Sequence, residues 1–578
     1  MSQLDWIVLI VTLSGIILFG LYKSKSTHDV DGYFLSNRSL PWGLVLLSIM
    51  GTQASAITFL AAPGQAYTDG MRFVQYYFGL PIAMVVLCIF FVPIFSKLKI
   101  YTAYEYLETR FDNKTRSLTS FLFLLQRGLS TGISIFAPSI ILSSLLGWNI
   151  YWTNLVMGGL LIIYTISGGA KAVAYTQQLQ LIIIFAGMFL AGSILVNMLP
   201  EGMGFSDALY IAGDFGKLNV ITTGFTNDGF NWSDQYNIFS GIVGGFFLAL
   251  SYFGTDQSQV GRYLTAKSLT QSRMGLLMNG LVKIPMQFFI LLLGVLLFSF
   301  YQFNKAPIFF NQSLVTMASQ TKYGATLNHI EQEYNKQISI ISNGQKEKNI
   351  LQKQNQSPVG VETSIQFANK TADSLRKEYK KTIAKSLPGV DTNDTNYIFL
   401  RFVMDYLPVG LVGLLIAIIF LAAWGSIAAA LNALASSTVI DFHRRFSKKS
   451  NSNEKEYSIS KWYTLAWGVF CIIVAMFTYQ IGNSLIEAVN ILGSLFYGVI
   501  LGVFLVAFFL KKITNGTFVF IAALLAEVIV LSVFAMTKFG VIQLGFLWLN
   551  PIGAISVLLL TLLLNAISQQ KNLFQRSN

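Results

Sequence analysis

Long apolar stretches, more than any motif, limit what this chain can fold into. A hydrocarbon core of about 30 Å is crossed by about 20 apolar residues of helix. Thirteen stretches qualify, and charged residues gather between them: 4–22, 41–66, 73–96, 117–145, 151–167, 173–198, 236–255, 276–303, 403–440, 461–480, 484–510, 515–536 and 546–567. Since 53% of the residues are hydrophobic and only 12% are charged, we predict an all-α polytopic membrane protein with about 13 transmembrane helices embedded in a lipid bilayer.

The distribution of positive charge predicts the topology. If the N-terminus lies outside, the inner loops carry 22 lysines and arginines, whereas the short outer loops carry three. Short loops rich in lysine and arginine lie on the cytoplasmic side. We therefore expect the N-terminus outside and the C-terminus in the cytoplasm. This distribution explains the net charge of +13 by topology, and nucleic acid is not expected as a partner.

The cysteines and histidines exclude several kinds of site. Cys88 and Cys471 both fall in apolar stretches, and the three histidines are scattered without metal-ligand spacing. No nucleophile–base pair lies within the apolar stretches, so we expect no enzymatic activity and no metal other than a transported ion. The first apolar run follows Asp5 without a basic region or a cleavage site, which indicates a retained helix. These features are compatible with a bacterial inner membrane.

One segment, 304–401, breaks the membrane pattern. It is polar, rich in lysine, glutamine and asparagine, and contains 13 lysines and arginines. Within it, residues 362–386 fit a charged amphipathic helix. Two interpretations remain open: an extracytoplasmic insertion with little fixed structure, or a lid or docking module whose protein partner is unknown.

Two apolar segments are interrupted by small and polar residues, near 48–64 and near 252–262. Interrupted helices at corresponding places in two halves of a chain point to a transporter binding site. Residues 41–198 hold five predicted helices and 236–510 hold five more in the opposite orientation, with a break in the first helix of each half. This arrangement predicts an inverted repeat.

Four stretches resemble the sodium/solute symporter family, which includes sodium–glucose, proline, iodide, monocarboxylate and sialic acid carriers. They are FVPIFSKLKIYTAYEYLETRF (91–111), SGGAKAVAYTQQLQ (167–180), DQSQVGRYLTAKS (256–268) and SIAAALNALASSTVIDF (426–442). The resemblance covers nearly all of 1–567 apart from the insertion. It implies a LeuT-like core of two inverted five-helix repeats with discontinuous helices, and sodium and substrate near the midplane.

The expected organisation combines the apolar pattern with this resemblance. Its parts are an extra N-terminal helix and cytoplasmic loop (1–40), the first five-helix repeat (41–198), an outer loop (199–235), the second repeat (236–303 and 402–510), the extracytoplasmic polar insertion (304–401), and two C-terminal helices with a cytoplasmic tail (511–578).

The resemblance implies a sodium site between the first break and the 403–440 helix. The carbonyl ligands of the family fall on Gly51, Ala54 and Ala422, and one of its two hydroxyl ligands falls on Ser426. The second hydroxyl position is Gly425, so one ligand is missing here.

Two departures from the family pattern bear on how many ions are bound. At Gly425, water or the nearby Ser55 is a candidate replacement for the missing hydroxyl, and weak sodium binding is the other possibility. Thr176 is followed by Gln177, where some members have a carboxylate that serves a second sodium ion. No lysine or arginine takes the place of the ion. We therefore predict Na⁺ as the coupling ion, with one ion bound.

Two ionisable residues within the apolar stretches are candidates for substrate binding, because such residues are costly in a membrane. Arg127 is expected near the midplane, where a guanidinium binds a planar carboxylate bidentately. Its alternative is a pair with a protein carboxylate or with helix-end carbonyls. Lys283 matches a family lysine that approaches the sugar in sodium–glucose carriers, and its alternative is snorkelling to the cytoplasmic face.

The resemblance assigns four more substrate positions. Thr58 and Asn490 fall where glucose carriers bind sugar, and Tyr77 replaces their glutamate, with Gln75 close by. Losing the glutamate removes an acceptor for sugar hydroxyls, whereas Arg127 adds a positive charge. We predict sodium-coupled import of an organic anion, such as a sialic acid or a monocarboxylate, by alternating access. A sodium-coupled neutral sugar or polyol symporter is the alternative, and a channel or a membrane sensor is less favoured.

Overall fold

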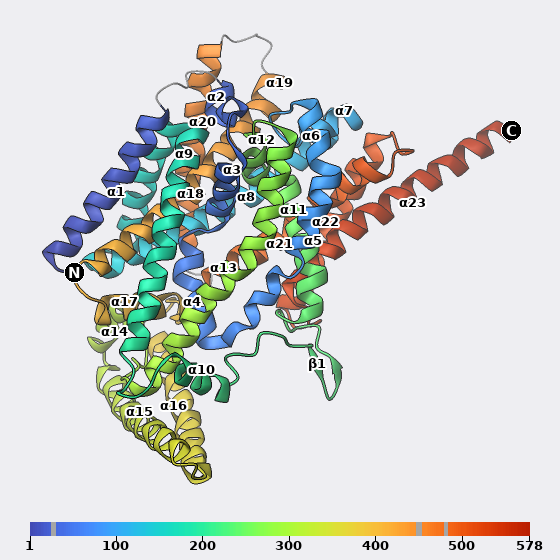
Figure 1. Cartoon of the computed structure of the whole chain (residues 1–578). Helices are drawn as coiled ribbons and strands as arrows, with labels where there is room; N and C mark the ends of the chain where they lie inside the picture. Colours follow the sequence, from blue (N-terminus) through green and yellow to red (C-terminus); the bar gives the residue numbers. More distant parts are fainter. Residues whose placement is uncertain (25–29, 447–452, 479–483, 578) are drawn as a thin grey trace.

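The computed structural model describes residues 1–24, 30–446, 453–478 and 484–577, and in this part helices dominate a single bundle (Figure 1). The helices of the first half are α1 Gln3–Ser24, α2 Val30–Leu35, η1 Ser36–Arg38, α3 Trp42–Gln53, α4 Ala56–Asp69, η2 Gly70–Tyr77, α5 Leu80–Val86, η3 Leu87–Phe91, α6 Val92–Leu98, α7 Glu105–Arg110, α8 Asn113–Leu146, α9 Ile150–Asn197 and α10 Phe205–Asp214.

A short hairpin of β1 Phe225–Thr226 and β2 Gly229–Phe230 precedes the second half. The remaining helices are η4 Ser240–Gly244, α11 Gly245–Thr255, α12 Gln257–Leu264, α13 Leu269–Phe303, α14 Gln312–Ser319, α15 Gly324–Lys353, α16 Val359–Ser386, η5 Thr395–Tyr397, α17 Ile398–Tyr406, α18 Leu411–Ser437, η6 Thr438–His443, α19 Arg444–Phe446, α20 Asn453–Thr478, α21 Leu485–Phe509, α22 Gly516–Lys538, η7 Phe546–Trp548 and α23 Leu549–Ser577.

Among the described residues, ten helices are long and apolar enough to cross a membrane, and three shorter apolar helices accompany them at Trp42–Gln53, Ile150–Ile166 and Ser240–Thr255. Large apolar side chains remain exposed on the outside of the bundle, as Phe189 (78%) and Phe289 (66%) illustrate. An apolar exterior of this kind suits a lipid environment. The all-α polytopic fold is confirmed, whereas the count of 13 crossings stays a prediction.

Helix α9 contains two of the predicted membrane segments. The hydroxyls of Tyr164 and Thr176 lie 2.7 Å apart although the residues are 12 positions apart. In a straight helix that separation is about 18 Å. The helix axis therefore reverses between these residues, in agreement with the predicted segments 151–167 and 173–198.

Both predicted helix breaks are confirmed. Ala54 and Ser55 separate α3 from α4, and Asp256 separates α11 from α12 in an extended conformation (φ −75°, ψ 115°). Asp256 also caps α12, because its side chain accepts a hydrogen bond from the Ser258 amide at 2.8 Å. Pro63, which lies in the first interrupted stretch, sits inside α4 without ending it.

The polar insertion 304–401 is folded, so the interpretation of little fixed structure is wrong. Helices α15 and α16 form a hairpin that projects from the lower end of the bundle (Figure 1). Apolar residues on its two helices, including Ile330, Tyr334 and Tyr379, form a hydrophobic cluster separate from the main core. The amphipathic helix expected over 362–386 is confirmed by α16.

The insertion contacts the bundle at the ends of two helices. Gly64 of α4 packs so closely on Thr395 that an added Cβ would lie 2.1 Å from the Thr395 carbonyl oxygen. The next residue, Asn396, accepts a hydrogen bond from the amide of Leu485, the first residue of α21, at 3.3 Å. The insertion is thus attached to α4 and α21, two helices that also line the site described below.

The buried carboxylate of Asp394 holds the segment that contacts α4 and α21 in place on the rest of the insertion. Asp394, immediately before Thr395, accepts hydrogen bonds from Arg376 at 2.9 Å and from Lys380 at 2.5 Å. Burial alone would raise the pKa of Asp394, but the two cations outweigh it and hold the pKa below its usual value. Asp394 is therefore ionised at neutral pH.

The opposite end of the bundle carries an ionic network. Asp441 of η6 accepts hydrogen bonds from Arg116 Nε and Ser120 Oγ, each at 2.9 Å. Glu108 of α7 binds the same Arg116 at 2.7 Å and also pairs with Arg445 of α19. These contacts join α7, α8, η6 and α19 at one end of the molecule.

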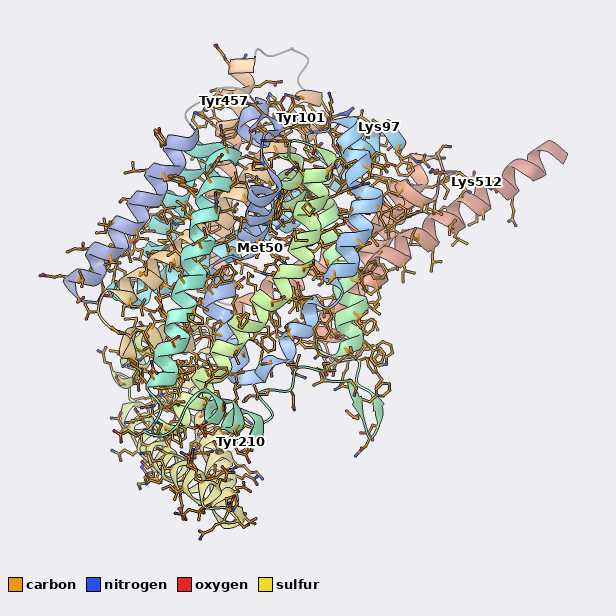
Figure 2. The ribbon with its side chains drawn as sticks, in the orientation of Figure 1. Met50, Lys97, Tyr101, Tyr210, Tyr457 and Lys512 are labelled. Carbon is orange, nitrogen blue, oxygen red and sulfur yellow. The ribbon has the colours of Figure 1, made fainter. Side chains whose placement is uncertain are left out.

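Labelled side chains mark the two ends of the bundle (Figure 2). Figure 2 shows Lys97, Tyr101, Tyr457 and Lys512 toward the upper end and Tyr210 toward the lower end, with Met50 between them. The chain ends on α23, which rises to the upper right of Figure 1.

Candidate functional site

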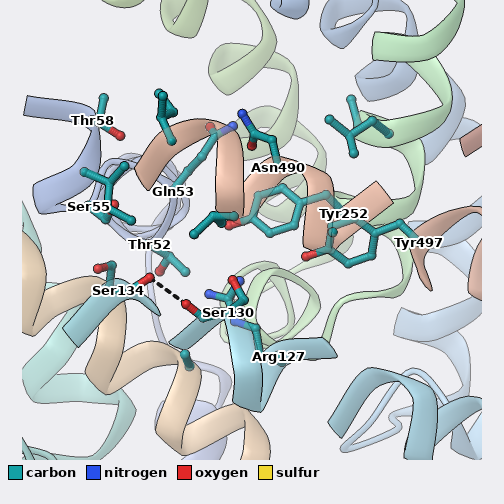
Figure 3. Close-up of a pocket in the computed structure, with 18 of the residues that line it drawn as sticks. Thr52, Gln53, Ser55, Thr58, Arg127, Ser130, Ser134, Tyr252, Asn490 and Tyr497 are labelled. Atoms are coloured by element: carbon teal, nitrogen blue, oxygen red, sulfur yellow. Dashed lines mark hydrogen bonds between the residues drawn. The ribbon is translucent and has the colours of Figure 1, made fainter. Parts of the chain in front are cut away.

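A cavity lies within the bundle, lined by residues of α3, α4, η2, α5, α8, α11, α18 and α21 (Figure 3). Its polar lining residues are Thr52, Gln53, Ser55, Thr58, Tyr76, Tyr77, Gln126, Arg127, Ser130, Thr131, Ser134, Tyr252, Ser426, Asn490 and Tyr497.

Five of the ten site residues predicted from the sequence line this cavity. Thr58, Tyr77, Arg127 and Asn490 line it, and so does Ser426 from the predicted sodium site. They come from the consecutive elements α4 and η2 and from α8, α18 and α21, which lie farther along the chain. The fold therefore brings candidate substrate and sodium residues together.

Arg127 of α8 is the one charged side chain among the described residues that line the cavity. Its Nη1 lies 3.6 Å from Oδ2 of Asp256, and its Cζ lies 5.9 Å from the ring centre of Tyr252. Within the described part of the chain, Nε of Arg127 has no hydrogen-bond partner. The guanidinium thus has a counter-charge but retains a free donor.

Asp256 is a functional candidate that the sequence interpretation did not name. Its Oδ2 accepts a hydrogen bond from Tyr497 at 2.7 Å, and its Oδ1 accepts one from Ser258 Oγ at 2.6 Å. The expected alternative for Arg127, a pair with a protein carboxylate, is therefore present. The signal was available, because an acidic residue at the second helix break is a natural partner for an arginine inside a membrane segment.

Two predicted substrate residues, Gln75 and Lys283, do not line the cavity. The amide of Gln75 is fully buried and donates to Thr222 Oγ1 at 3.0 Å and to the Tyr236 carbonyl at 2.9 Å, so its role is to anchor the outer loop. Lys283 is 0% exposed and its Nζ lies 5.4 Å from the ring centre of Tyr77. Snorkelling is therefore the wrong interpretation of Lys283, which lies beside a cavity residue and not at the surface.

The first helix break releases the two carbonyls predicted as sodium ligands. In a continuous helix, the amides of Ser55 and Thr58 would donate to the carbonyls of Gly51 and Ala54. Instead Ser55 donates to the Gln53 carbonyl at 3.1 Å and Thr58 donates to the Ser55 carbonyl at 3.0 Å. Both predicted carbonyls are thereby free to coordinate an ion, as unwound backbone does in transporters.

The facing helix α18 offers a hydroxyl for the same purpose. Ser426 Oγ donates its proton to the Ala423 carbonyl at 3.0 Å, which leaves the oxygen lone pairs available as acceptors. Ala422, the third predicted carbonyl donor, lies one turn earlier on the same buried helix. These residues fit a sodium ion, because every candidate ligand is a neutral oxygen.

A glutamine bridges the two sides of the predicted sodium site. Gln177 of α9 donates to the Gly425 carbonyl at 3.1 Å and to Thr52 Oγ1 at 3.2 Å, and it accepts from Ser48 Oγ at 2.9 Å. Gln177 thus places a neutral amide at the position where some members of the sodium/solute symporter family, which the sequence resembles, have a carboxylate. The prediction of a single sodium ion remains a prediction.

Comparison with known proteins extends these observations. The model of the sodium:solute symporter family matches residues 33–326 and 379–525. The unmatched stretch between these ranges covers most of the α15–α16 hairpin. The hairpin is thus an addition to the family pattern.

The similar proteins include bacterial and animal transporters. The chain is 25% identical over 561 residues to the sodium/sialic acid symporter SiaT of Proteus mirabilis (strain HI4320), covering 96% of this chain and 93% of that protein. It is 31% identical over 278 residues to the human sodium-coupled monocarboxylate transporter 1, covering 48% of this chain and 44% of that protein.

A solved structure shares the fold. The substrate-bound outward-open state of a Na⁺-coupled sialic acid symporter superposes with a TM-score of 0.73 at 24% identity, covering 97% of this chain and 96% of that one. The likeness extends over nearly the whole chain, so the predicted LeuT-like arrangement with discontinuous helices is confirmed.

Proposed function

Because this chain belongs to the sodium:solute symporter family, we propose that it imports a small organic anion, of the sialic acid or monocarboxylate class, together with one sodium ion. Arg127 carries the proposal, since it places a positive charge on the wall of the cavity, and its buried Nε has no hydrogen-bond partner among the described residues. A substrate carboxylate can accept two parallel hydrogen bonds from a guanidinium. The sialic acid and monocarboxylate specificities of the similar transporters support the same class of substrate.

The coupling mechanism follows from the position of the two sites. Sodium binds between the first helix break and α18, through the carbonyls of Gly51, Ala54 and Ala422 and the hydroxyl of Ser426, and stabilises the outward-open state. The substrate then binds against the broken segment, the outer gates close, and the bundle rocks to release both inward. One sodium ion that crosses a potential of 100 mV contributes about 2.3 kcal/mol.

Thr58, Tyr77 and Asn490 are the further substrate contacts in this proposal, because they line the same cavity as Arg127. They present hydroxyl and amide groups that bind the polar groups of an acidic sugar. Lys283 acts on the substrate only through Tyr77, beside which it lies.

A neutral sugar or polyol is the second candidate substrate. The observation in its favour is the Arg127–Asp256 pair, in which the charge of Arg127 is already balanced before any substrate enters. The family and its relatives are transporters, and we propose no enzymatic activity, channel function or signalling role for this chain.

We also propose a location in a bacterial inner membrane with the N-terminus outside and the C-terminus in the cytoplasm. The basic inner loops support this orientation, and so does the position of Lys97 and Lys512 at the end opposite the insertion (Figure 2). The hairpin α15–α16 then lies outside the cell.

Solid-supported-membrane currents from proteoliposomes test the proposal. Sialic acid, lactate, glucose and inositol are added in turn, first with sodium and then with potassium. We expect a sodium-dependent current with an acidic compound, and Arg127→Gln should abolish that current while sodium still binds. A current with glucose or inositol alone would instead support the neutral solute and leave Arg127 with a structural role.

A further inference from the structure

Gly425 leaves the predicted sodium site one oxygen short, and the structure brings another oxygen to this place. An added Cβ at Gly425 would lie 2.6 Å from Oε1 of Gln180, a residue of α9. A Cβ atom does not approach a non-bonded heavy atom to less than about 3.0 Å, so a side chain at position 425 would displace Oε1 of Gln180. The amide oxygen of Gln180 therefore lies beside the space that a serine side chain at position 425 would enter.

Gln180 differs from its neighbour Gln177 in what holds it. The two residues are three positions apart and share one face of α9. Gln177 has both amide atoms engaged, on Ser48, Thr52 and the Gly425 carbonyl. Gln180 is 3% exposed, and within the described residues its Nε2 has no hydrogen-bond partner.

A buried amide nitrogen without a hydrogen-bond partner is unusual in a folded protein and calls for an explanation, of which a bound ion beside the amide is one. Carbonyl oxygens are suitable ligands for hard cations, and they supply a ligand without adding a charge. The adjacent helix break already presents two free carbonyls, those of Gly51 and Ala54, as shown above. The chemistry required to complete the site is one more neutral oxygen, and Gln180 brings it.

We propose that Gln180 Oε1 is a sodium ligand and replaces the hydroxyl that is missing at Gly425. The full ligand set is then the carbonyls of Gly51, Ala54 and Ala422, Ser426 Oγ and Gln180 Oε1. The small residue at 425 has a role in this arrangement, because any side chain there would push the amide away. The inference rests on the proposed sodium coupling and adds α9 to the helices that hold the ion.

Direct sodium binding to the purified full-length protein tests this assignment. The measurements are ²²Na⁺ scintillation proximity and the sodium-induced rise in melting temperature, each against potassium. Gln180→Leu keeps the volume but removes the oxygen, and we expect it to raise the sodium Kd by at least about tenfold, since even outer partners of metal ligands change affinity by about 10- to 100-fold.

A matched control separates loss of a ligand from loss of a buried amide. Asn154 lies on the first segment of α9, is buried, and donates to the Ala475 carbonyl at 3.2 Å. Asn154→Leu should leave the sodium Kd unchanged. An equal rise of the Kd in both variants would overturn the proposal.

A rescue experiment distinguishes a ligand from a packing residue. Gln180→Ala should weaken sodium binding, and the double variant Gln180→Ala/Gly425→Ser should recover most of the affinity, because the new hydroxyl enters the vacated space. Gly425→Ala should weaken binding without supplying an oxygen. An unchanged Kd in Gln180→Leu, or failure of Gly425→Ser to restore binding to Gln180→Ala, overturns the ligand assignment.

The wild-type protein provides the remaining distinction. If it shows no preference for sodium over potassium, the proposed coupling ion is wrong and this inference fails with it. If it binds sodium and the Gln180 variants bind as well as wild type, only the assignment of Gln180 is wrong.

Discussion

Arg127 has one counter-charge in the protein, Asp256, and in our proposal it also binds the carboxylate of the substrate. Asp256 lies 3.6 Å away, which is too long for a strong hydrogen bond, while Tyr497 and Ser258 bind the same carboxylate at 2.7 and 2.6 Å. Asp256 is thus held by hydroxyls and needs the guanidinium only as a counter-charge. A substrate carboxylate can therefore take the donors of Arg127 without leaving Asp256 unsolvated.

We expect Asp256→Asn to strengthen anion binding and to weaken the fold. Without the carboxylate, the guanidinium is an unbalanced buried charge, a change that costs about 3–5 kcal/mol, and a bound anion relieves it. The measurements are the Kd for sialic acid and the melting temperature with and without ligand.

Ser258→Ala is the control for this prediction, because it removes one hydrogen bond to Asp256 but leaves the charge in place. It should lower the melting temperature slightly and leave the Kd close to the wild-type value. A folded Asp256→Asn variant that binds sialic acid no better than wild type would contradict the prediction.

At this scale the sequence predicts candidate residues in local motifs, and it does not point to candidates that meet only through the fold. Ser426 and the carbonyls of Gly51 and Ala54 follow from a helix break and a family motif. Asp256 and Gln180 do not, because their partners Arg127 and Gly425 lie on other helices. Gln75 was assigned to the substrate from its proximity to Tyr77 in sequence, yet successive residues of a helix point to different faces.

At the scale of elements, the contact between α4 and η5 decides how firmly the insertion is attached. We expect Gly64→Ala to lower the melting temperature, because the new Cβ would lie 2.1 Å from the Thr395 carbonyl oxygen and backbone must move. Hydrogen exchange should rise in η5 and α16.

Gly360→Ala provides the comparison, since an added Cβ on this residue of α16 meets no atom within 4 Å. Alanine also favours a helix over glycine by about 1 kcal/mol. That variant should be as stable as wild type or more so. Equal exchange in the two variants would show that the α4 contact does not hold the insertion.

The ion cluster formed by Asp394, Arg376 and Lys380 should contribute the same stability at neutral and mildly acidic pH. Arg376 and Lys380 lower the pKa of Asp394, so its contribution to stability is complete above the ordinary aspartate pKa of about 3.9 and is lost as the pH falls through the lowered value. We expect Asp394→Asn to lower the melting temperature by the same amount from pH 8 to pH 5 and by less below about pH 4.

Asp373→Asn, on the exposed face of α16, should change the melting temperature little at any of these pH values. If the effect of Asp394→Asn fades already between pH 7 and pH 5, the carboxylate titrates near neutrality and the cluster does not lower its pKa.

Elements with a strong apolar pattern were predictable, and so were both breaks, because small and polar residues interrupt long apolar runs. The fold of the insertion was only partly predictable. Its polar composition obscures the apolar stripes of α15 and α16. These stripes pack against each other and not against the main core. Only the part of α16 with a clear amphipathic period was found.

At the scale of the whole molecule, the network of Arg116, Asp441, Glu108 and Arg445 joins α7, α8, η6 and α19 at one end of the bundle. We expect Glu108→Gln to shift the population toward states open at that end, because it weakens both arginine contacts. A cysteine introduced at Asn279, which is 0% exposed, reports the opening in a Cys88→Ser/Cys471→Ser background.

Labelling of that cysteine by a water-soluble maleimide should become several-fold faster in Glu108→Gln. Glu333→Gln is the control, since Glu333 forms an exposed pair with Lys336 on the insertion at the other end. Equal labelling rates in wild type and Glu108→Gln would show that the network does not control access.

The α15–α16 hairpin also has a practical consequence for imaging. Small transporters are difficult to align in electron cryomicroscopy, because a detergent micelle hides nearly all of their features. A helix of 30 residues is about 45 Å long, and here it is paired with a second helix, packed on its own apolar core and joined to the bundle at α4 and α21. Projecting from one end only, it marks the orientation of each particle and distinguishes the two pseudo-symmetric halves without an added antibody fragment.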